Sequence, residues 1–392
     1  MNRPRLVIVP GKEKALLRRH PWVFSGAVKR IEGHPQEGDL VDIVDSQGQW
    51  MATGHFQDES IICKVLSFDT PQVDDSFLRQ RIVEAIDYRR RLGFFDNPDT
   101  NVFRLVHAEG DYLPGLVCDW YNGVLVMQAH SVGMHRAFPV LADIFRTELG
   151  PHGLVSVFDK SSTTLPGGSV DGYLWGDEPQ EWQVEEHGNR LLINFFEGQK
   201  TGFFVDQREN RLLLHDLARG HRVLNCFGYT GGFSLAALRG GAEYVETVDI
   251  SKKAIALCNR NVDLNFGPDA PHQGVVADVL QYIQTLGPSF DLIVLDPPAF
   301  AKNHRSLQSG LRGYRTVNQR ALEAMPAGGL LMTFSCSQAV SRDDFQTMVF
   351  TAAMNAHRRV RIVRRLPHAM DHPVSICHPE GEYLKGLLLQ VE

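Results

Sequence analysis

Short hydrophobic runs alternate with amphipathic stretches in the second half of the chain, from about residue 184 onward. The hydrophobic runs cover residues 223–226, 244–248, 274–277, 292–295 and 330–334. Runs this compact are typical of parallel strands buried on both faces. The stretches between them have helical spacing over 233–239, 252–264 and 278–286, and Ser251 is the expected N-cap of the second. The alternation predicts a doubly wound α/β sheet within residues 188–392.

The first 187 residues predict two smaller domains, 1–74 and 75–187. The first has β-like runs separated by Gly, Pro and Asp turns, at residues 6–9, 40–44 and 61–67, with a basic helix or loop over 12–23. This pattern predicts a small β-barrel. The second predicts an α+β domain, with helices over 77–92 and 135–149, strands over 116–119, 124–128 and 154–158, and a loop or weak hairpin over 161–180.

Length and composition fit a protein of several domains. The 392 residues exceed one ordinary core, and 43% hydrophobic with 22% charged residues is a globular balance. No apolar run reaches the length of a membrane span, and residues 1–14 lack the apolar centre of a signal peptide. The six cysteines include no Cys-x-x-Cys pair, which disfavours a zinc site and a disulfide framework. We therefore expect a cytoplasmic protein with no bound metal.

Basic residues cluster locally although the net charge is −6. One cluster lies in the first 30 residues and includes Lys12, Lys14, Arg18 and Arg19; a second includes Lys302, Arg305, Arg312 and Arg315; a third holds five arginines over 358–365. One such run alone is usually a solvated face. The first two adjoin stretches with other functional signals, so we expect them to contact a polyanion such as RNA.

Polar or glycine-rich loops follow all five predicted strands of the second half. In doubly wound sheets, ligands bind beyond the carboxyl ends of the strands. The loop 225–233 is rich in glycine but has neither dinucleotide nor P-loop spacing, which favours a nucleoside ligand without phosphates. The later loops contribute Asp249, Asp278, the Asp296-Pro297-Pro298 turn and the Ser335-Cys336-Ser337 segment. One strand-end aspartate is usually a turn residue or a cap; five functional loops in succession indicate a ligand site.

The set of loops resembles the class I S-adenosylmethionine methyltransferases. The whole chain is similar to the PUA-domain-containing cytosine-5 methyltransferases of bacterial large-subunit ribosomal RNA. The segments that carry the resemblance are 12–28, 104–105, 109–116, 185–188, 200–208, the loop from Asn225, 296–298, 334–337, 379–381 and 383–386. The resemblance implies a PUA-like RNA-binding domain at residues 1–74, a middle domain and a Rossmann-like methyltransferase domain.

The resemblance also implies a cofactor, a substrate and their contacts. The cofactor is S-adenosylmethionine and the substrate is large-subunit ribosomal RNA; a homodimer is compatible, but no dimer interface is evident in the sequence. The implied cofactor contacts are Asn225, Gly228, Thr230, Gly231, Asp249, Asp278 and Asp296, with Phe203, Gln207 and Arg208 closing the methionine end.

Cys336 is the predicted nucleophile. Carbon 5 of cytosine is a poor nucleophile until a thiolate adds to carbon 6, so methylation there needs covalent help. An unpaired cysteine is most often a small buried apolar residue. Cys336 instead lies between two serines at a predicted strand end, where a thiolate can be stabilised. Asp296 is the expected hydrogen-bond partner of the cytosine N3/N4 edge, with the Pro297 carbonyl orienting the amino group.

Two departures from the family pattern leave other readings open. Ala299 follows the two prolines where family members commonly have a polar residue, and the segment 159–168 differs from the family's Arg-rich stretch. We expect these differences to bear on the target nucleotide rather than on the reaction. One alternative is an RNA methyltransferase that modifies a base nitrogen without covalent catalysis. Another is a non-catalytic ribosome-assembly factor that binds RNA and has kept the fold.

Overall fold

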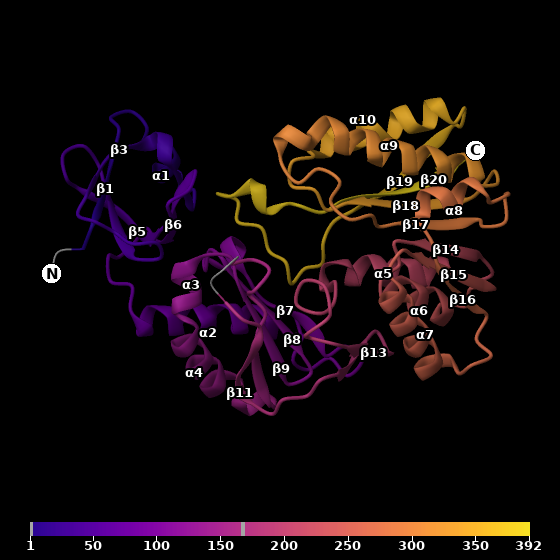
Figure 1. Cartoon of the computed structure of the whole chain (residues 1–392), viewed down its shortest axis with the longest axis horizontal. Helices are drawn as coiled ribbons and strands as arrows, with labels where there is room; N and C mark the ends of the chain where they lie inside the picture. Colours follow the sequence, from indigo (N-terminus) through magenta and orange to yellow (C-terminus); the bar gives the residue numbers. More distant parts are fainter. Residues whose placement is uncertain (1–2, 166–168) are drawn as a thin grey trace. The chain divides into compact units, whose positions relative to one another are not determined.

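The computed structural model describes residues 3–165 and 169–392 (Figure 1). Residues 166–168, the end of the divergent segment 159–168, therefore lie outside the described residues. The chain divides into two compact units. The first unit consists of residues 1–184, 193–205 and 370–381, and the second of 185–192, 206–369 and 382–392. The first unit holds both predicted N-terminal domains, so the boundaries 1–74, 75–187 and 188–392 stay a prediction.

A six-stranded sheet forms the start of the first unit. Its strands are β1 (Arg5–Ile8), β2 (Trp22–Phe24), β3 (Val28–Glu32), β4 (Leu40–Val44), β5 (Trp50–Phe56) and β6 (Ile61–Ser67), in the order β2-β6-β5-β4-β1-β3. The predicted strands 40–44 and 61–67 match β4 and β6. The basic stretch 12–23 contains the short helix α1 (Lys14–Leu17) and then enters β2. Leu6, Val41 and Ile43 are buried in the core of this sheet.

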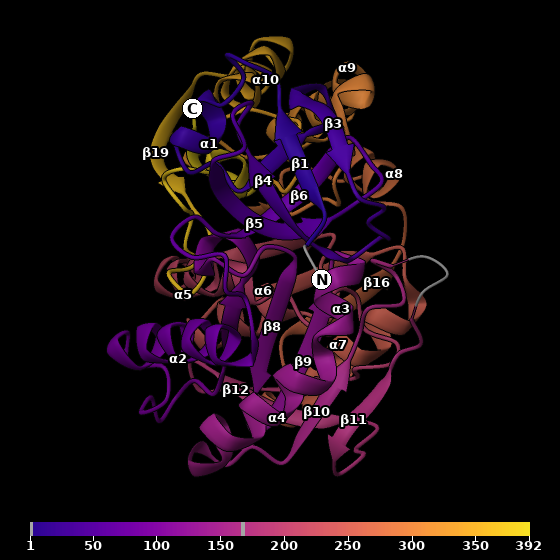
Figure 2. The same ribbon diagram turned by 90° about the vertical axis from the view of Figure 1, so that its left-hand side faces the viewer.

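The rest of the first unit is a five-stranded sheet with helices packed on it (Figure 2). Its strands are β7 (Val102–His107), β8 (Leu116–Tyr121), β9 (Val124–Ala129), β10 (Ser156–Asp159) and β11 (Gly172–Gly176), and its helices are α2 (Asp75–Arg91), α3 (Val132–Arg136) and α4 (Phe138–Leu149). The single helix predicted over 135–149 is wrong in its start and continuity. Ser131 caps α3, and α4 begins separately with Pro139 in its first turn, a position proline favours.

The strands β12 (Trp182–Glu186) and β13 (Asn189–Ile193) pair with each other, and residues 185–192 of this pair belong to the second unit. There the predicted doubly wound sheet is confirmed, with the order β16-β15-β14-β17-β18-β20-β19. The strands are β14 (Arg222–Cys226), β15 (Tyr244–Asp249), β16 (His272–Val276), β17 (Leu292–Leu295), β18 (Leu330–Ser335), β19 (Val360–Leu366) and β20 (Lys385–Val391). The first five are parallel, while β20 runs antiparallel to both β18 and β19.

Six helices cover this sheet among the residues that the structure describes. They are α5 (Arg208–Leu217), α6 (Gly232–Arg239), α7 (Lys252–Phe266), α8 (Val279–Gln284), α9 (Leu307–Ala324) and α10 (Arg342–Asn355). Figure 1 shows α5, α6 and α7 on one face and α8, α9 and α10 on the other. Ser251 caps α7 as predicted, because its hydroxyl accepts a hydrogen bond from the amide of Ala254 at 3.2 Å.

Candidate functional site

The carboxyl ends of β14, β15, β17 and β18 meet at one edge of the second unit's sheet. From β14 the chain passes to β15 and β16 on one side and returns to β17 and β18 on the other, so the strand order reverses at β14. A crevice forms at such a reversal in open α/β sheets, and ligands bind there. The structure thus brings the predicted glycine loop to the same edge as the loops that begin at Asp296 and Cys336.

The glycine loop is held close against β15. The amide of Gly228 donates to the carbonyl of Val248 at 3.1 Å, and a Cβ at Gly228 would overlap the methyl group of Thr247. Gly231, with φ of 86°, leads directly into α6. Phe227 and Tyr229 have φ of 58° and 47°, a left-handed conformation that is uncommon for non-glycine residues and that the surrounding structure must stabilise. The loop can therefore bring backbone amides close to a ligand.

A chain of hydrogen bonds fixes the amide of Asn225. Its Nδ2 donates to Ser234 Oγ at 2.8 Å, Ser234 Oγ lies 2.6 Å from Thr247 Oγ1, and Thr247 Oγ1 lies 2.7 Å from His272 Nε2. Burial lowers the pKa of His272 to about 4, so the ring is neutral at pH 7 and one ring nitrogen can accept. We infer that each hydroxyl accepts from the side of Asn225 and donates toward His272.

Two buried oxygens of the glycine loop have no partner among the described residues. They are Asn225 Oδ1 and Thr230 Oγ1, in side chains that are 1% and 4% exposed. Buried polar atoms are normally hydrogen-bonded, and an exception calls for a bound molecule or water. A ligand with an amino group and hydroxyl groups, as S-adenosylmethionine has, fits these two acceptors.

Two of the predicted aspartates, Asp249 and Asp278, lie at the end of β15 and just after β16, at this edge of the sheet. The carboxylate of Asp249 accepts from the amides of Tyr229 at 3.0 Å and Ser251 at 2.8 Å, which leaves lone pairs on both oxygens. Asp278 is exposed and caps α8, accepting from the amide of Gln281 at 3.0 Å. The capping role explains why an aspartate stands at position 278 even without a ligand, so the contact of Asp278 with the cofactor stays a prediction.

The residues predicted at the methionine end fall in both units. Phe203 is buried in the first unit, where its amide donates to the hydroxyl of Tyr121 at 3.2 Å. Gln207 and Arg208 are buried in the second unit, and Gln207 Oε1 accepts from Asn210 Nδ2 at 2.6 Å. Their contact with a cofactor stays a prediction.

The loops after β17 and β18 pack against each other around Cys336. Cys336 is partly buried and its Sγ lies 3.9 Å from the carbonyl oxygen of Pro297. Next to it, Ser337 Oγ lies 2.7 Å from the hydroxyl of Tyr314 and accepts from the amide of Ala301 at 3.2 Å. These bonds tie the thiol to the Asp296–Ala301 turn. Asp296 itself is half-buried directly after β17.

The other cysteines differ from Cys336 in exposure or in place. Cys63, Cys118, Cys226 and Cys258 are fully buried, and burial raises the pKa of each thiol. A buried apolar setting disfavours the thiolate, which is the nucleophilic form. Cys377 is partly buried but belongs to the first unit. Within the second unit's described residues, Cys336 is thus the cysteine best suited to attack a substrate.

Lys385 lies next to the Cys336 segment, although in the sequence it stands out only as part of a segment that resembles the family. It lies opposite Ser335 in the antiparallel pair of β18 and β20, and its Nζ donates to the carbonyl of Ser337 at 2.6 Å. Burial lowers the pKa of Lys385 to about 8; Cys336 raises it and Arg342 lowers it further. A neighbouring ammonium group stabilises a thiolate. The pairing register, which connects residues 50 apart, is the signal that could have found it.

The basic residues predicted to bind RNA lie at the surface. Lys12, Lys14, Arg18 and Arg19 surround α1 in the first unit and are exposed; Lys302, Arg305, Arg312 and Arg315 surround the start of α9 in the second unit. Arg19 forms an exposed ion pair with Asp69 at 2.6 Å, and Lys12 Nζ donates to Gly26 O at 2.6 Å. Arg312 and Arg315 are three residues apart on α9 and therefore share a face.

Over residues 3–165 and 169–392, no group of three or more His, Cys, Asp or Glu side chains is arranged to hold a metal ion. Over the same residues, no helix has the length and apolar character needed to span a membrane.

Comparisons with known proteins give the same domain types. A family described as S-adenosylmethionine-dependent methyltransferase matches residues 160–383, and a PUA-like domain matches residues 6–68. Proteins named ribosomal RNA large subunit methyltransferase I are similar over the whole chain. That of Salmonella arizonae is 40% identical over 400 residues, covering 100% of this chain and 98% of its own. That of Escherichia coli K12 is 40% identical over 397 residues, covering 99% of each.

Solved structures share the fold of the whole chain. A structure described as a SAM-dependent methyltransferase from Streptococcus mutans has a TM-score of 0.85 at 22% identity, covering 98% of this chain and 99% of its own. A methyltransferase crystallised with SAH has a TM-score of 0.86 at 22% identity and the same coverage. At this identity the likeness concerns the fold.

Proposed function

This chain belongs to the S-adenosylmethionine-dependent methyltransferase family, and we propose that it forms 5-methylcytidine in large-subunit ribosomal RNA. Its 40% identity, over its whole length, to proteins named ribosomal RNA large subunit methyltransferase I supports this substrate. In the proposal, Cys336 is the nucleophile. The observation that carries this proposal is the position of the Cys336 thiol. It is partly buried and lies 3.9 Å from the Pro297 carbonyl, at the edge where the glycine loop also ends.

In the proposed reaction, Cys336 and Asp296 act on the base. The Cys336 thiolate adds to carbon 6 of cytosine, which makes carbon 5 electron-rich enough to take a methyl group. A proton then leaves carbon 5 to a base, the bond between sulfur and carbon 6 breaks, and the thiolate is restored. Asp296 holds the N3/N4 edge of the cytosine, and the Pro297 carbonyl orients its amino group. S-adenosylmethionine, when bound, supplies the electrophilic methyl group.

The cofactor site of this proposal consists of the glycine loop and the strand ends beside it. Asn225 Oδ1 and Thr230 Oγ1 are buried acceptors of this loop that have no partner among the described residues, and both suit an amino or hydroxyl group. Gly228 and Gly231 let the backbone approach the ligand, and Asp249 keeps lone pairs for ribose hydroxyls. Asp278, Phe203, Gln207 and Arg208 belong to the proposed site by resemblance alone.

RNA binding is assigned to the PUA-like domain and to the start of α9. The phosphate contacts in this proposal come from seven exposed residues and the partly exposed Arg315; the seven are Lys12, Lys14, Arg18, Arg19, Lys302, Arg305 and Arg312. The target base must leave its stack to reach Cys336, at a cost of a few kcal/mol that such backbone contacts offset. A cytoplasmic location and a homodimer remain parts of the proposal.

The test compares the wild type with Cys336→Ala and with the matched control Cys377→Ala. Each protein is incubated with methyl-labelled S-adenosylmethionine and unmodified large-subunit ribosomal RNA, and the digested nucleosides are identified by mass spectrometry. We expect label in 5-methylcytidine from the wild type and Cys377→Ala, and none from Cys336→Ala. RNA containing 5-fluorocytidine should trap a covalent complex only with the first two.

Other outcomes would favour the alternative functions. Label on a base nitrogen, or full activity of Cys336→Ala, would refute the covalent mechanism and point to a nitrogen methyltransferase. Binding of RNA with no transfer by the wild type, on free RNA or on ribosomal particles, would point to a non-catalytic assembly factor.

A further inference from the structure

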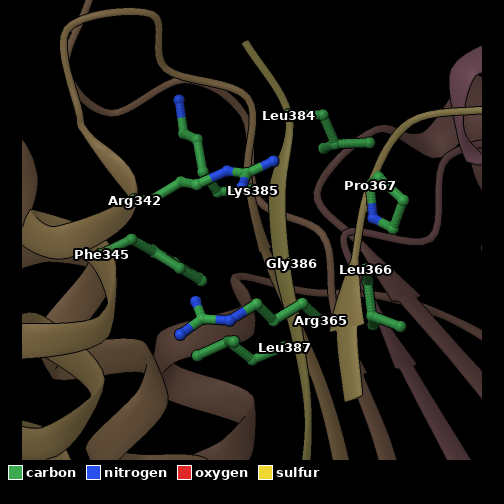
Figure 3. A pocket seen from close by; sticks show the side chains of 9 residues that line it. All are labelled: Arg342, Phe345, Arg365, Leu366, Pro367, Leu384, Lys385, Gly386 and Leu387. Atoms are coloured by element: carbon green, nitrogen blue, oxygen red, sulfur yellow. The ribbon is translucent and has the colours of Figure 1, made fainter. Parts of the chain in front are cut away.

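A cavity opens in the second unit beside the loop that carries Cys336. Its volume is about 180 Å³. The first turn of α10, the end of β19 and the start of β20 surround it (Figure 3), and the lining residues are Arg342, Phe345, Arg365, Leu366, Pro367, Leu384, Lys385, Gly386 and Leu387.

All the charged residues that line this cavity are basic. They are Arg342 and Arg365, whose guanidinium groups Figure 3 shows on either side of the Phe345 ring, and Lys385. One carboxylate offsets them from outside the lining, because Glu382 forms an ion pair with Arg342. Arg365 is exposed and donates to the neutral Gln346 Oε1 at 2.8 Å. The cavity therefore has an excess of positive charge that an anion would balance.

Arg365 belongs to the third basic cluster of the sequence, and it differs from the other arginines of this cluster in its partners and its position. Of its five arginines, Arg358 donates to the backbone carbonyls of residues 322, 325 and 392, and both Arg359 and Arg361 form ion pairs with Glu392. Arg364 and Arg365 follow each other on β19, so their side chains point to opposite faces of the strand. Only Arg365 of this cluster lines the cavity.

The apolar part of the lining narrows the class of anion. Phe345, Leu366, Leu384 and Leu387 are buried, and Pro367 is exposed at the rim. An inorganic ion makes no use of such a surface. A nucleotide of a single-stranded RNA does, because its phosphate suits arginine while its sugar and base have flat or apolar faces.

The position of the cavity relates it to the proposed reaction. Lys385 lines the cavity and donates to the carbonyl of Ser337, the residue after Cys336. An enzyme that draws a base out of its stack must hold the neighbouring backbone. We propose that this cavity binds a nucleotide phosphate of the RNA strand next to the target cytosine, with Arg342 and Arg365 as its ligands. This inference rests on the proposed function.

The test compares Arg365→Gln and Arg342→Gln with Arg364→Gln, the matched control on the adjacent position of β19. Binding of unmodified large-subunit ribosomal RNA transcript is measured between 50 and 300 mM salt, together with methyl-transfer kinetics and S-adenosylhomocysteine binding. Loss of one phosphate contact in a single strand reduces the slope of log K against log salt by about 0.7. We expect this reduction, with about tenfold weaker binding, a raised KM and an unchanged kcat, for Arg365→Gln. Arg342→Gln should show the same changes to a smaller degree, because Glu382 already pairs with Arg342, and Arg364→Gln should show none of them.

The outcomes separate the cavity from the proposed function. Arg365→Lys, which keeps the charge, should keep the salt slope. Slopes equal to wild type in Arg365→Gln and Arg342→Gln, with transfer to cytosine intact, would overturn the phosphate site while leaving the proposed function standing. Equal losses in Arg364→Gln would also overturn it, because they would reflect general surface charge. Absence of any transfer by the wild type would overturn both. Unchanged S-adenosylhomocysteine binding shows that each variant is folded.

Discussion

Replacing Thr247 with valine should weaken cofactor binding although Thr247 has no place in the proposed contacts. Thr247 is fully buried, and its hydroxyl connects Ser234 at 2.6 Å with His272 at 2.7 Å. Valine keeps the shape and removes the hydroxyl. Ser234 then loses its acceptor, and the amide of Asn225 loses the chain that keeps Nδ2 on Ser234 and Oδ1 open to a ligand.

The magnitude follows from the groups left without partners. One buried hydroxyl without an acceptor costs about 1–3 kcal/mol of stability, and Ser234 is fully buried. The ring of His272 is partly exposed and can bond to water instead, so the loss of its bond to Thr247 adds little to the cost in stability. For the cofactor, the loss is about one hydrogen bond, 0.5–1.5 kcal/mol, which corresponds to about a 2- to 12-fold rise in Kd.

Titration calorimetry with S-adenosylhomocysteine and thermal unfolding measure the two effects separately. Thr247→Ser is the matched control, because it keeps the hydroxyl and removes only the methyl group that abuts Gly228. It should lose some stability and keep its cofactor affinity. Valine and serine variants with the same Kd would refute the idea that this chain orients Asn225.

Three further predictions concern pH and buried charge. Burial lowers the pKa of His272 to about 4 in the folded protein, so as pH falls the unfolded chain takes up a proton on this residue first. The free energy of unfolding should therefore fall by up to about 3 kcal/mol as pH drops from 6.5 to 4. Urea unfolding of His272→Gln should show a smaller decline over this range, and an equal decline would contradict the lowered pKa of His272. If the Lys385 ammonium group stabilises the Cys336 thiolate, the single-turnover rate should fall as pH rises through about 8, the lowered pKa of Lys385. Lys385→Gln should then lose this alkaline decline of the rate. An unchanged decline in the variant would exclude Lys385 as the group that stabilises the thiolate. The carboxylate of Asp119 is 0% exposed and pairs with Arg104 at 2.5 Å, so Arg104→Leu leaves a buried carboxylate without its main cation. Chemical denaturation should show a loss of about 3–5 kcal/mol in the free energy of unfolding, and the double variant with Asp119→Leu should recover much of this loss. A loss below about 1 kcal/mol in Arg104→Leu would refute the argument.

The elements predicted correctly are those whose signal is local. The strand 292–295 is buried on both faces, so all of its residues are apolar and the run predicts its full length. Ser251 predicts the start of α7, because serine is a preferred N-cap residue. The break at Ala137 was missed because both halves of 135–149 keep helical spacing across it. The adjacency of the glycine loop to the Asp296 and Cys336 loops was predictable, since carboxyl ends of neighbouring parallel strands share one edge. Which contact each residue makes there depends on side-chain packing that no local pattern encodes.

The strand β19 illustrates a signal that sequence alone cannot resolve. An edge strand with one exposed side has no apolar run, so residues 360–366 read as part of a charge cluster rather than as a strand. Its meaning changes once the pairing with β20 is known, because Glu392 then lies beside Arg359 and Arg361, while Arg365 borders a cavity with Arg342 and Lys385. The sequence alone gives each of these arginines the same charge. Their attraction for a phosphate differs in the fold, because an arginine already paired with a carboxylate attracts a phosphate less than one paired with a neutral amide.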